Sequence, residues 1–105
     1  MNELFEILAE PNRRRILEVL RTGEHTVSTI VEHLEISQPG VSRHLRLLRE
    51  AGLVEVRAEA QLRIYSLRVE PLTELDRWLE PYRAYWNRHL DALERHLDAT
   101  GDDDK

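Results

Sequence analysis

The spacing of apolar side chains along the chain changes several times, and each change marks a new element. Apolar residues recur at helical intervals over residues 2–9 and 12–22, so the sequence predicts two short helices. Asn12 is a suitable N-cap for the second helix, and Gly23 is a suitable stop.

Two further helices are predicted before the pattern becomes strand-like. The third begins at Thr26 or Ser28, either of which can cap it, and ends near Leu34. The fourth covers residues 37–51, where a Ser N-cap and a proline in the first turn favour helix initiation. Its expected buried face has spacings of four and three residues: Val41, Leu45 and Leu48.

Residues 53–57 and 62–67 alternate between apolar and polar side chains, as β-strands do. A turn at Glu59-Ala60 would join the two segments. The sequence therefore predicts a β-hairpin over about residues 54–68.

A last helix is predicted over about residues 71–98. Its apolar positions are three or four residues apart, close to a heptad repeat, and Pro81 should kink it. Residues 100–105 are expected to form a disordered acidic tail. The repeat consists of Leu72, Leu75, Leu79, Tyr82, Trp86, Leu90, Leu93 and Leu97.

Composition narrows the class of protein. A chain of 105 residues predicts one domain, which we place at residues 1–99. The chain has no cysteine, which excludes disulfides and thiolate metal sites and fits a reducing cytoplasm. The N-terminus does not resemble a signal peptide, and no apolar stretch approaches about 20 residues, so we expect a cytoplasmic protein without a membrane span.

Charge is distributed unevenly, although the net charge is −5. Residues 12–21 carry four arginines against one glutamate, and residues 37–68 carry six arginines against three glutamates. Residues 69–105 carry five bases against ten acids. Nucleic acid responds to the local field and not to net charge. Charge alone leaves open whether the basic segments face phosphates or are only solvated.

The third and fourth predicted helices, joined by a tight turn, suggest a helix-turn-helix. In that motif the second helix enters the DNA major groove, and its N-terminal residues reach base edges. Gln38 can pair with adenine, Arg43 with guanine, and Ser42 with bases or phosphates. The predicted DNA contacts on this helix are Ser37, Gln38, Pro39, Ser42, Arg43, His44, Arg46 and Arg49.

Two alternatives remain open at this helix. Any exposed helix would also carry a polar outer face, so the pattern by itself does not establish DNA binding. His44 either packs the helix or contacts a phosphate.

Basic residues outside this helix are further candidates. Arg57 and Arg63 flank the hairpin turn, where they could reach the minor groove or the DNA backbone. Alternatively, they are surface residues of an ordinary exposed hairpin. Arg13 and Arg14 are candidate phosphate contacts.

Four segments together resemble the ArsR/SmtB-type winged-helix repressors, over nearly the whole chain to about Leu97. They are residues 10–17 (EPNRRRIL), 37–45 (SQPGVSRHL), 48–54 (LREAGLV) and 63–67 (RIYSL). The resemblance implies a mainly α (α+β) winged helix-turn-helix with long terminal dimerisation helices and a two-stranded β-wing. It also implies a homodimer on an inverted-repeat operator, often overlapping the regulator's own promoter.

The implied dimer interface lies on the first and last helices. The predicted residues are Leu4, Phe5, Leu8, Leu75, Leu79, Tyr82, Trp86, Leu90, Leu93 and Leu97. The aromatic group Trp78, Tyr82, Tyr85 and Trp86 could instead line a small-molecule pocket, although such a stripe suits an interface better.

The chain departs from the family pattern at three places. The wing tip reads Glu59-Ala60-Gln61, where the family usually has a glycine beside a basic residue. Residues 29–34 lack the Cys-x-Cys pair of the metal-sensing members, which excludes soft-metal sensing there. The last helix carries His89, Asp91, Glu94 and His96, whose spacing differs from the family's second metal site. We expect no metal and no cofactor, and assign the chain to the subgroup without metal sites.

These observations predict a sequence-specific double-stranded DNA-binding transcriptional regulator. The resemblance implies that it is a homodimeric repressor, which could act on its own promoter; the residues themselves leave activation open. The competing class is a winged-helix module that binds protein and not DNA. We expect no enzyme, because the sequence has no Cys nucleophile, Gly-rich phosphate loop or convincing carboxylate–His cluster. The sequence leaves open whether the regulator also binds an effector or a partner protein.

Overall fold

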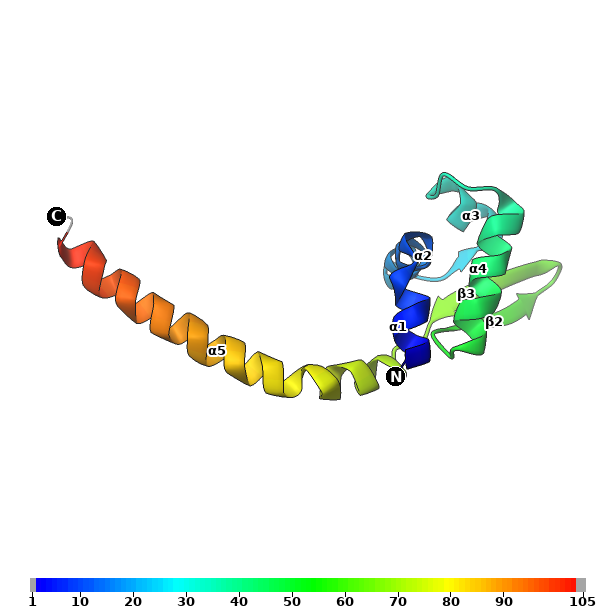
Figure 1. The fold of residues 1–105 in the computed structure, drawn as a ribbon. Coiled ribbons are helices and arrows are strands. Elements are labelled where there is room, and N and C mark those ends of the chain that lie inside the picture. The colour runs from blue at the N-terminus through cyan, green and yellow to red at the C-terminus, as the bar shows by residue number, and fades with distance from the viewer. Residues whose placement is uncertain (1, 104–105) are drawn as a thin grey trace. The chain divides into compact units, whose positions relative to one another are not determined.

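The structure, a computed structural model, describes the backbone of residues 2–103 and the side chains of residues 2–98. The elements in chain order are α1 (Asn2–Ala9), α2 (Pro11–Arg21), β1 (His25–Thr26), α3 (Val27–Glu32), α4 (Gln38–Glu50), β2 (Val54–Glu59), β3 (Leu62–Leu67) and α5 (Leu72–Asp103) (Figure 1). The mainly helical fold with a winged helix-turn-helix is confirmed. None of the described helices is both long and apolar enough to cross a membrane.

The chain forms two compact units, Met1–Glu74 and Leu75–Lys105, and each is described by itself. The first unit contains the helix-turn-helix and the sheet, and the second consists of most of α5. The single domain expected over residues 1–99 stays a prediction.

Helix α2 is capped by Glu10, so the prediction of Asn12 as its N-cap is wrong. The Glu10 carboxylate accepts a hydrogen bond from the Arg13 backbone N–H at 3.0 Å. Pro11 then occupies the first helical turn, where its missing N–H leaves no partner unsatisfied. Asn12 is therefore already inside the helix, and its side chain donates to Glu10 at 3.4 Å.

The other N-caps agree with the sequence. Thr26, one of the two candidates, caps α3 by accepting from the Thr29 N–H at 3.4 Å. Ser37 caps α4 by accepting from the Gly40 N–H at 3.3 Å. Because Ser37 caps α4, the start of this helix is defined by a local hydrogen bond.

The sheet has three antiparallel strands in the order β1-β3-β2, one more than the predicted two-stranded wing. His25 pairs with Tyr65 and Thr26 with Ile64, so these two residues form a short edge strand. Two residues are too few for any alternating pattern, and their pairing depends on the position of β3.

The wing consists of β2 and β3, with Val54 opposite Leu67 and Glu59 opposite Leu62. The turn between them is Ala60-Gln61, one residue later than predicted. Ala60 has a φ of 56°, in the left-handed region that glycine adopts easily and alanine does not.

The core of the first unit lies under α4. Val41, Leu45 and Leu48 are fully buried, as their spacing predicts. The other large, fully buried side chains come from α2, α3, the residue before β2 and the first residue of β2: Ile16, Ile30, Leu53 and Val54. One face of α4 is thus held by apolar packing, and the opposite face is exposed.

Helix α5 continues without interruption through Pro81 and ends at Asp103. It extends beyond the end predicted near residue 98, because one glycine in a helix costs only about 1 kcal/mol relative to alanine. Residues 104–105, the rest of the predicted disordered tail, lie outside the described residues.

Candidate nucleic-acid interface

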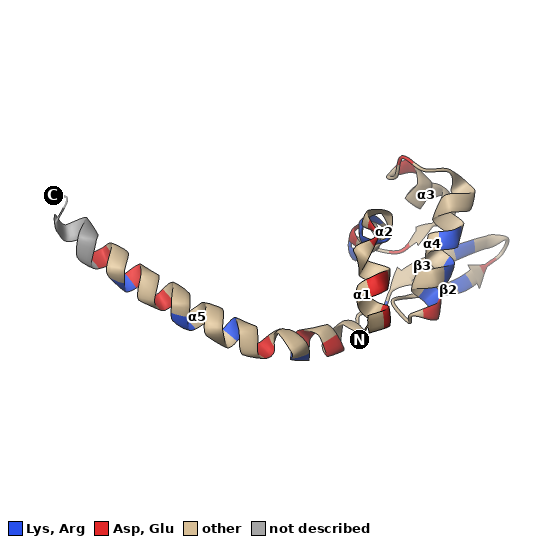
Figure 2. Ribbon diagram, in the orientation of Figure 1, with Lys and Arg blue, Asp and Glu red and all other residues tan. Residues whose placement is uncertain are grey.

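The outer face of α4 gathers most of the predicted DNA contacts. Ser37, Gln38 and Arg49 are exposed on it. Its central part is a shallow hollow lined by Pro39, Ser42, Arg43 and Arg46. Figure 2 shows basic residues on α4 and on the strands of the wing.

Four of these arginines form no ion pair in the described part of the chain. Among the described residues, Arg43, Arg46, Arg49 and Arg63 have no ion pair or side-chain hydrogen bond. Their guanidinium groups can therefore reach an external anion without first breaking an internal contact. A planar guanidinium also fits a phosphate or a guanine edge with two hydrogen bonds.

Arg49 and Arg63 belong to one hollow that spans two elements. Arg49 comes from α4 and Arg63 from β3, and the floor between them is formed by Val56 and Ala58 of β2. This arrangement places a cation from the helix and a cation from the wing around one space. Two guanidinium groups beside one hollow are suited to binding a single anion.

Arg57 differs from its neighbours because it is already paired. Its Nη1 lies 2.7 Å from Glu24 Oε2, and its Nη2 lies 3.2 Å from Glu59 Oε2. The hydrogen bond with Glu24 is the main reason that the pKa of Arg57 is raised above its ordinary value. Two carboxylates beside this guanidinium reduce its attraction for a phosphate.

Arg13 and Arg14 lie at the end of α1 and not on the outer face of α4. Arg13 Nε donates to the Ile7 carbonyl at 2.7 Å, and Arg14 Nη1 donates to the Leu8 carbonyl at 2.6 Å. The last carbonyls of a helix have no intrahelical partner, and basic side chains can satisfy them. Sequence reasoning missed this role, although three arginines directly after a helix end were a signal for it.

His44 is the one predicted contact on α4 that the structure does not bring to the outer face. Its side chain is 17% exposed, with Nδ1 3.5 Å from Arg13 Nη1 and Nε2 3.7 Å from Glu10 Oε2. Of the two alternatives left open by the sequence, this position fits helix packing.

The predicted dimer residues fall into two groups. On α5 the apolar stripe is open: Leu75 and Leu79 are half-buried, while Tyr82, Trp86, Leu90, Leu93 and Leu97 are about half exposed or more. On α1, Leu4 is buried in the first unit, whereas Phe5 is exposed and Leu8 is half-buried. Leu4 therefore contributes to the core of its own subunit, and the open apolar surface is mainly on α5.

Two aromatic residues extend this stripe. Trp78 and Tyr85 are also about half exposed, and Trp78 packs against Tyr82 with ring centroids 4.9 Å apart. Tyr85 stacks on His89 at 5.4 Å. These rings lie along one surface of α5, as an interface needs.

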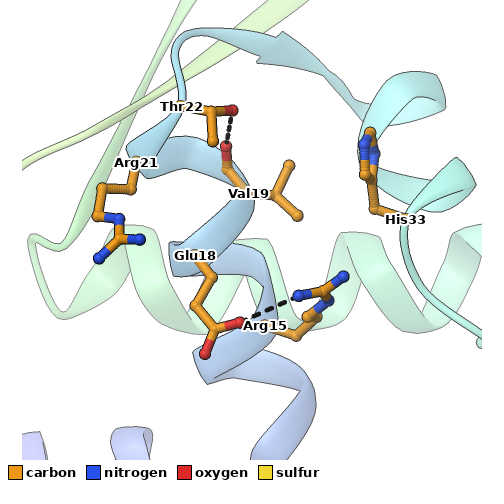
Figure 3. Close-up of a pocket in the computed structure, with 6 residues that line it drawn as sticks. All are labelled: Arg15, Glu18, Val19, Arg21, Thr22 and His33. Carbon is orange, nitrogen blue, oxygen red and sulfur yellow. Dashed lines mark hydrogen bonds and ion pairs between the residues drawn. The ribbon is translucent and has the colours of Figure 1, made fainter.

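A separate hollow lies between α2 and α3, and it includes His33 from the segment 29–34 (Figure 3). Arg15 pairs with Glu18 at 3.1 Å, and Thr22 Oγ1 donates to the Val19 carbonyl at 2.6 Å. His33 Nδ1 lies 2.8 Å from the Thr29 carbonyl. Within residues 2–98, no group of three or more His, Asp or Glu side chains could hold a metal ion.

A tightly turned pair of helices followed by a β-hairpin defines a winged helix-turn-helix protein. The family model described as "Bacterial regulatory protein, arsR family" matches residues 10–56. The transcriptional repressor SdpR of Bacillus subtilis is 35% identical over 75% of this chain and 88% of that protein. The HTH-type transcriptional regulator Rv2034 of Mycobacterium tuberculosis is 35% identical over 94% of this chain and 90% of that protein.

A solved structure is also similar to this chain. The crystal structure of a possible transcriptional regulator for arsenical resistance is 36% identical, with a TM-score of 0.67 over 89% of this chain and 93% of that chain. This chain therefore belongs to the arsR family of bacterial regulatory proteins.

Proposed function

We propose that this protein is a homodimeric, sequence-specific transcriptional repressor that binds an inverted-repeat operator. The observation that carries the proposal is the outer face of α4, where Arg43 and Arg46 are exposed and unpaired among the described residues while the opposite face is fully buried. The names of the relatives, a transcriptional repressor and a transcriptional regulator, support the same function.

Base recognition belongs to the first turns of α4. Gln38 offers a bidentate pair for adenine, Arg43 offers one for guanine, and the Ser42 hydroxyl accepts or donates as the base requires. These side chains project from the half of the helix that enters the groove first in a helix-turn-helix. Loss of one bidentate contact should reduce discrimination by about 1–3 kcal/mol.

Affinity that does not depend on sequence comes from the remaining free arginines. Arg46, Arg49 and Arg63 would neutralise backbone phosphates and release counterions, so binding should weaken steeply with salt. Arg57 should contribute less, because Glu24 and Glu59 already neutralise it.

Dimerisation follows from the need to read two half-sites. Two recognition helices must lie about 34–36 Å apart to enter successive major grooves on one side of the duplex. The open stripe on α5 offers the surface for pairing, since Leu90 is 61% exposed and Trp86 is 51% exposed in the single chain. Apolar side chains this open gain free energy when a second copy covers them.

The alternative of a protein-binding module is less well supported. Such a module would keep the fold but would have no use for a row of unpaired arginines along a polar helix. A repressor acts on the chromosome, so the proposed function goes with a cytoplasmic location. Membership of a regulator family also fits the expectation that the chain is not an enzyme.

The test is fluorescence anisotropy with a labelled duplex from the DNA just upstream of the protein's own gene. The titration is made at two salt concentrations, with a scrambled duplex as competitor. Arg43→Ala is compared with Arg21→Ala, an exposed arginine on α2 that lies away from the outer face of α4. We expect saturation at two subunits per site, and loss of sequence preference only in Arg43→Ala.

Equal, salt-sensitive binding to both duplexes would place the target elsewhere on the chromosome. No binding at low salt would reject the proposed function and favour the protein-binding module.

A further inference from the structure

One set of polar contacts connects α1, α2 and α4 within the first unit. Its centre is Arg13, near the start of α2. Arg13 Nε donates to the Ile7 carbonyl at 2.7 Å and Nη2 donates to the Glu6 carbonyl at 3.2 Å. A cation at this place satisfies unpaired carbonyls and interacts favourably with the negative end of the α1 helix dipole. The Arg13 guanidinium is therefore held on the C-terminal end of α1.

The remaining nitrogen of this guanidinium reaches α4. Arg13 Nη1 lies 3.5 Å from His44 Nδ1. A guanidinium can only donate hydrogen bonds, so Nδ1 must be the acceptor and the imidazole proton lies on Nε2. Nε2 in turn faces Glu10 Oε2 at 3.7 Å. The His44 ring thus lies between a donor and an acceptor on α2, and both favour the same tautomer.

This contact lies beside a groove between α1 and α4. The groove is lined by the apolar side chains Ile7, Leu47 and Ala51, by Arg13, and by three carboxylates: Glu3, Glu6 and Glu50. Apolar side chains in contact can adjust with little directional preference, whereas a hydrogen bond weakens steeply when its angle changes. The Arg13–His44 contact is consequently a directional link between the end of α1 and the middle of α4.

His44 immediately follows the residues assigned to base recognition, Ser42 and Arg43. Successive residues of a helix are about 100° apart around its axis, because a turn takes 3.6 residues. A side chain held on the inner side of α4 therefore determines where the side chain of Arg43 points.

We propose that His44 is a positioning residue for DNA recognition, bonded to Arg13 so that α4 keeps a fixed orientation relative to the C-terminal end of α1. The inference rests on the proposed function and concerns the same site. His44 itself does not contact DNA.

The two possible roles of His44, phosphate contact and positioning residue, predict different effects of its loss on the salt dependence of DNA binding. A side chain that contacts a phosphate adds to the number of counterions released, so its loss makes the salt dependence shallower. A positioning residue changes how well α4 fits the correct bases and leaves that number unchanged. Loss of a positioning residue should therefore lower the affinity for the operator and leave the affinity for a scrambled duplex unchanged.

The variants are His44→Leu, which removes both ring contacts, and His44→Asn, whose amide oxygen can accept from Arg13 near the position of Nδ1. His33→Leu is the matched control, because His33 lies in the same helix-turn-helix and, in the part of the chain that the structure describes, its ring contacts the Thr29 carbonyl and His25 and not Arg13 or α4. Thermal unfolding of each variant establishes that it is folded. Anisotropy then gives the affinity for the operator and the scrambled duplex over a range of salt concentrations.

We expect His44→Leu to lower operator affinity about tenfold, the effect of one lost hydrogen bond, with unchanged affinity for the scrambled duplex and an unchanged salt slope. His44→Asn should recover most of this loss, and His33→Leu should bind as wild type does. Equal losses on both duplexes with a shallower slope would overturn the inference in favour of a phosphate contact. Unchanged operator binding in His44→Leu would also overturn it.

A second measurement does not depend on DNA. Nitrogen-15 NMR of the wild-type imidazole should show His44 with its proton on Nε2, and the opposite tautomer would overturn the inference. If the wild type shows the expected tautomer but binds no duplex, the Arg13–His44 link stands and the proposed function fails. If the wild type binds its operator and His44→Leu binds equally well, the function stands and the positioning role fails.

Discussion

The wing turn stores backbone strain that a single substitution should release. Ala60 has a φ of 56°, and it is the first residue of the two-residue turn between β2 and β3. The left-handed region brings an alanine Cβ too close to its own backbone, and glycine has no Cβ. We therefore predict that Ala60→Gly stabilises the protein.

The expected stabilisation is the difference between the strain removed at position 60 and the entropy cost of introducing glycine. An L-residue in the left-handed region costs about 1–2 kcal/mol. Glycine removes this cost, but it loses more conformational entropy on folding than alanine does, which offsets about 0.5–1 kcal/mol of the gain. The expected net gain in the free energy of unfolding is about 0.5–1 kcal/mol. For a domain of this size that gain raises Tm by roughly 2–8 °C.

The assay is thermal unfolding followed by circular dichroism, with urea unfolding to confirm an unchanged m-value. All samples have the same protein concentration, because dimerisation makes Tm depend on it. The control is Ala58→Gly, at an exposed position inside β2 where no positive φ occurs. Glycine inside a strand should destabilise by about 0.5–1 kcal/mol.

The two variants should thus shift Tm in opposite directions. If Ala60→Gly lowers Tm as much as Ala58→Gly does, the turn is not strained at Ala60 and the reasoning is refuted.

Three further predictions concern the DNA-facing residues, the core and the dimer. Arg49→Ala should reduce the slope of log affinity against log salt by about 0.9, the value for one phosphate contact. Arg57→Ala should change this slope less, because its charge is already paired with two carboxylates; equal changes would contradict the pairing. Leu48→Ala, at a fully buried position under α4, should lower the free energy of unfolding by about 2–5 kcal/mol in urea titrations, and a loss below about 1 kcal/mol would mean that the site is not close-packed. The double variant Leu90→Glu and Leu93→Glu should sediment as a monomer with greatly reduced operator affinity, whereas a variant that remains dimeric would remove α5 from the interface.

Much of the fold could be predicted from sequence because its signals are local. A buried face on α4 requires only that apolar residues recur every three or four positions, and Val41, Leu45 and Leu48 do so. The Ser37 cap forms within one helical turn, so it too can be recognised from neighbouring residues. The outer face of α4 follows from the same geometry, since residues opposite a buried stripe must face outward.

The sequence by itself thus determined the order of helices and hairpin, the buried side of α4 and the polar side that carries Arg43. Tertiary structure decided which charged groups remain free, because a partner can come from a distant segment. Arg57 is paired with Glu24 across the sheet, and His44 is held by Arg13 thirty-one residues earlier in the chain. Neither contact has a periodic signature, since it depends on how the elements pack. For that reason two arginines of similar sequence context, Arg57 and Arg63, differ in the charge that they present to DNA.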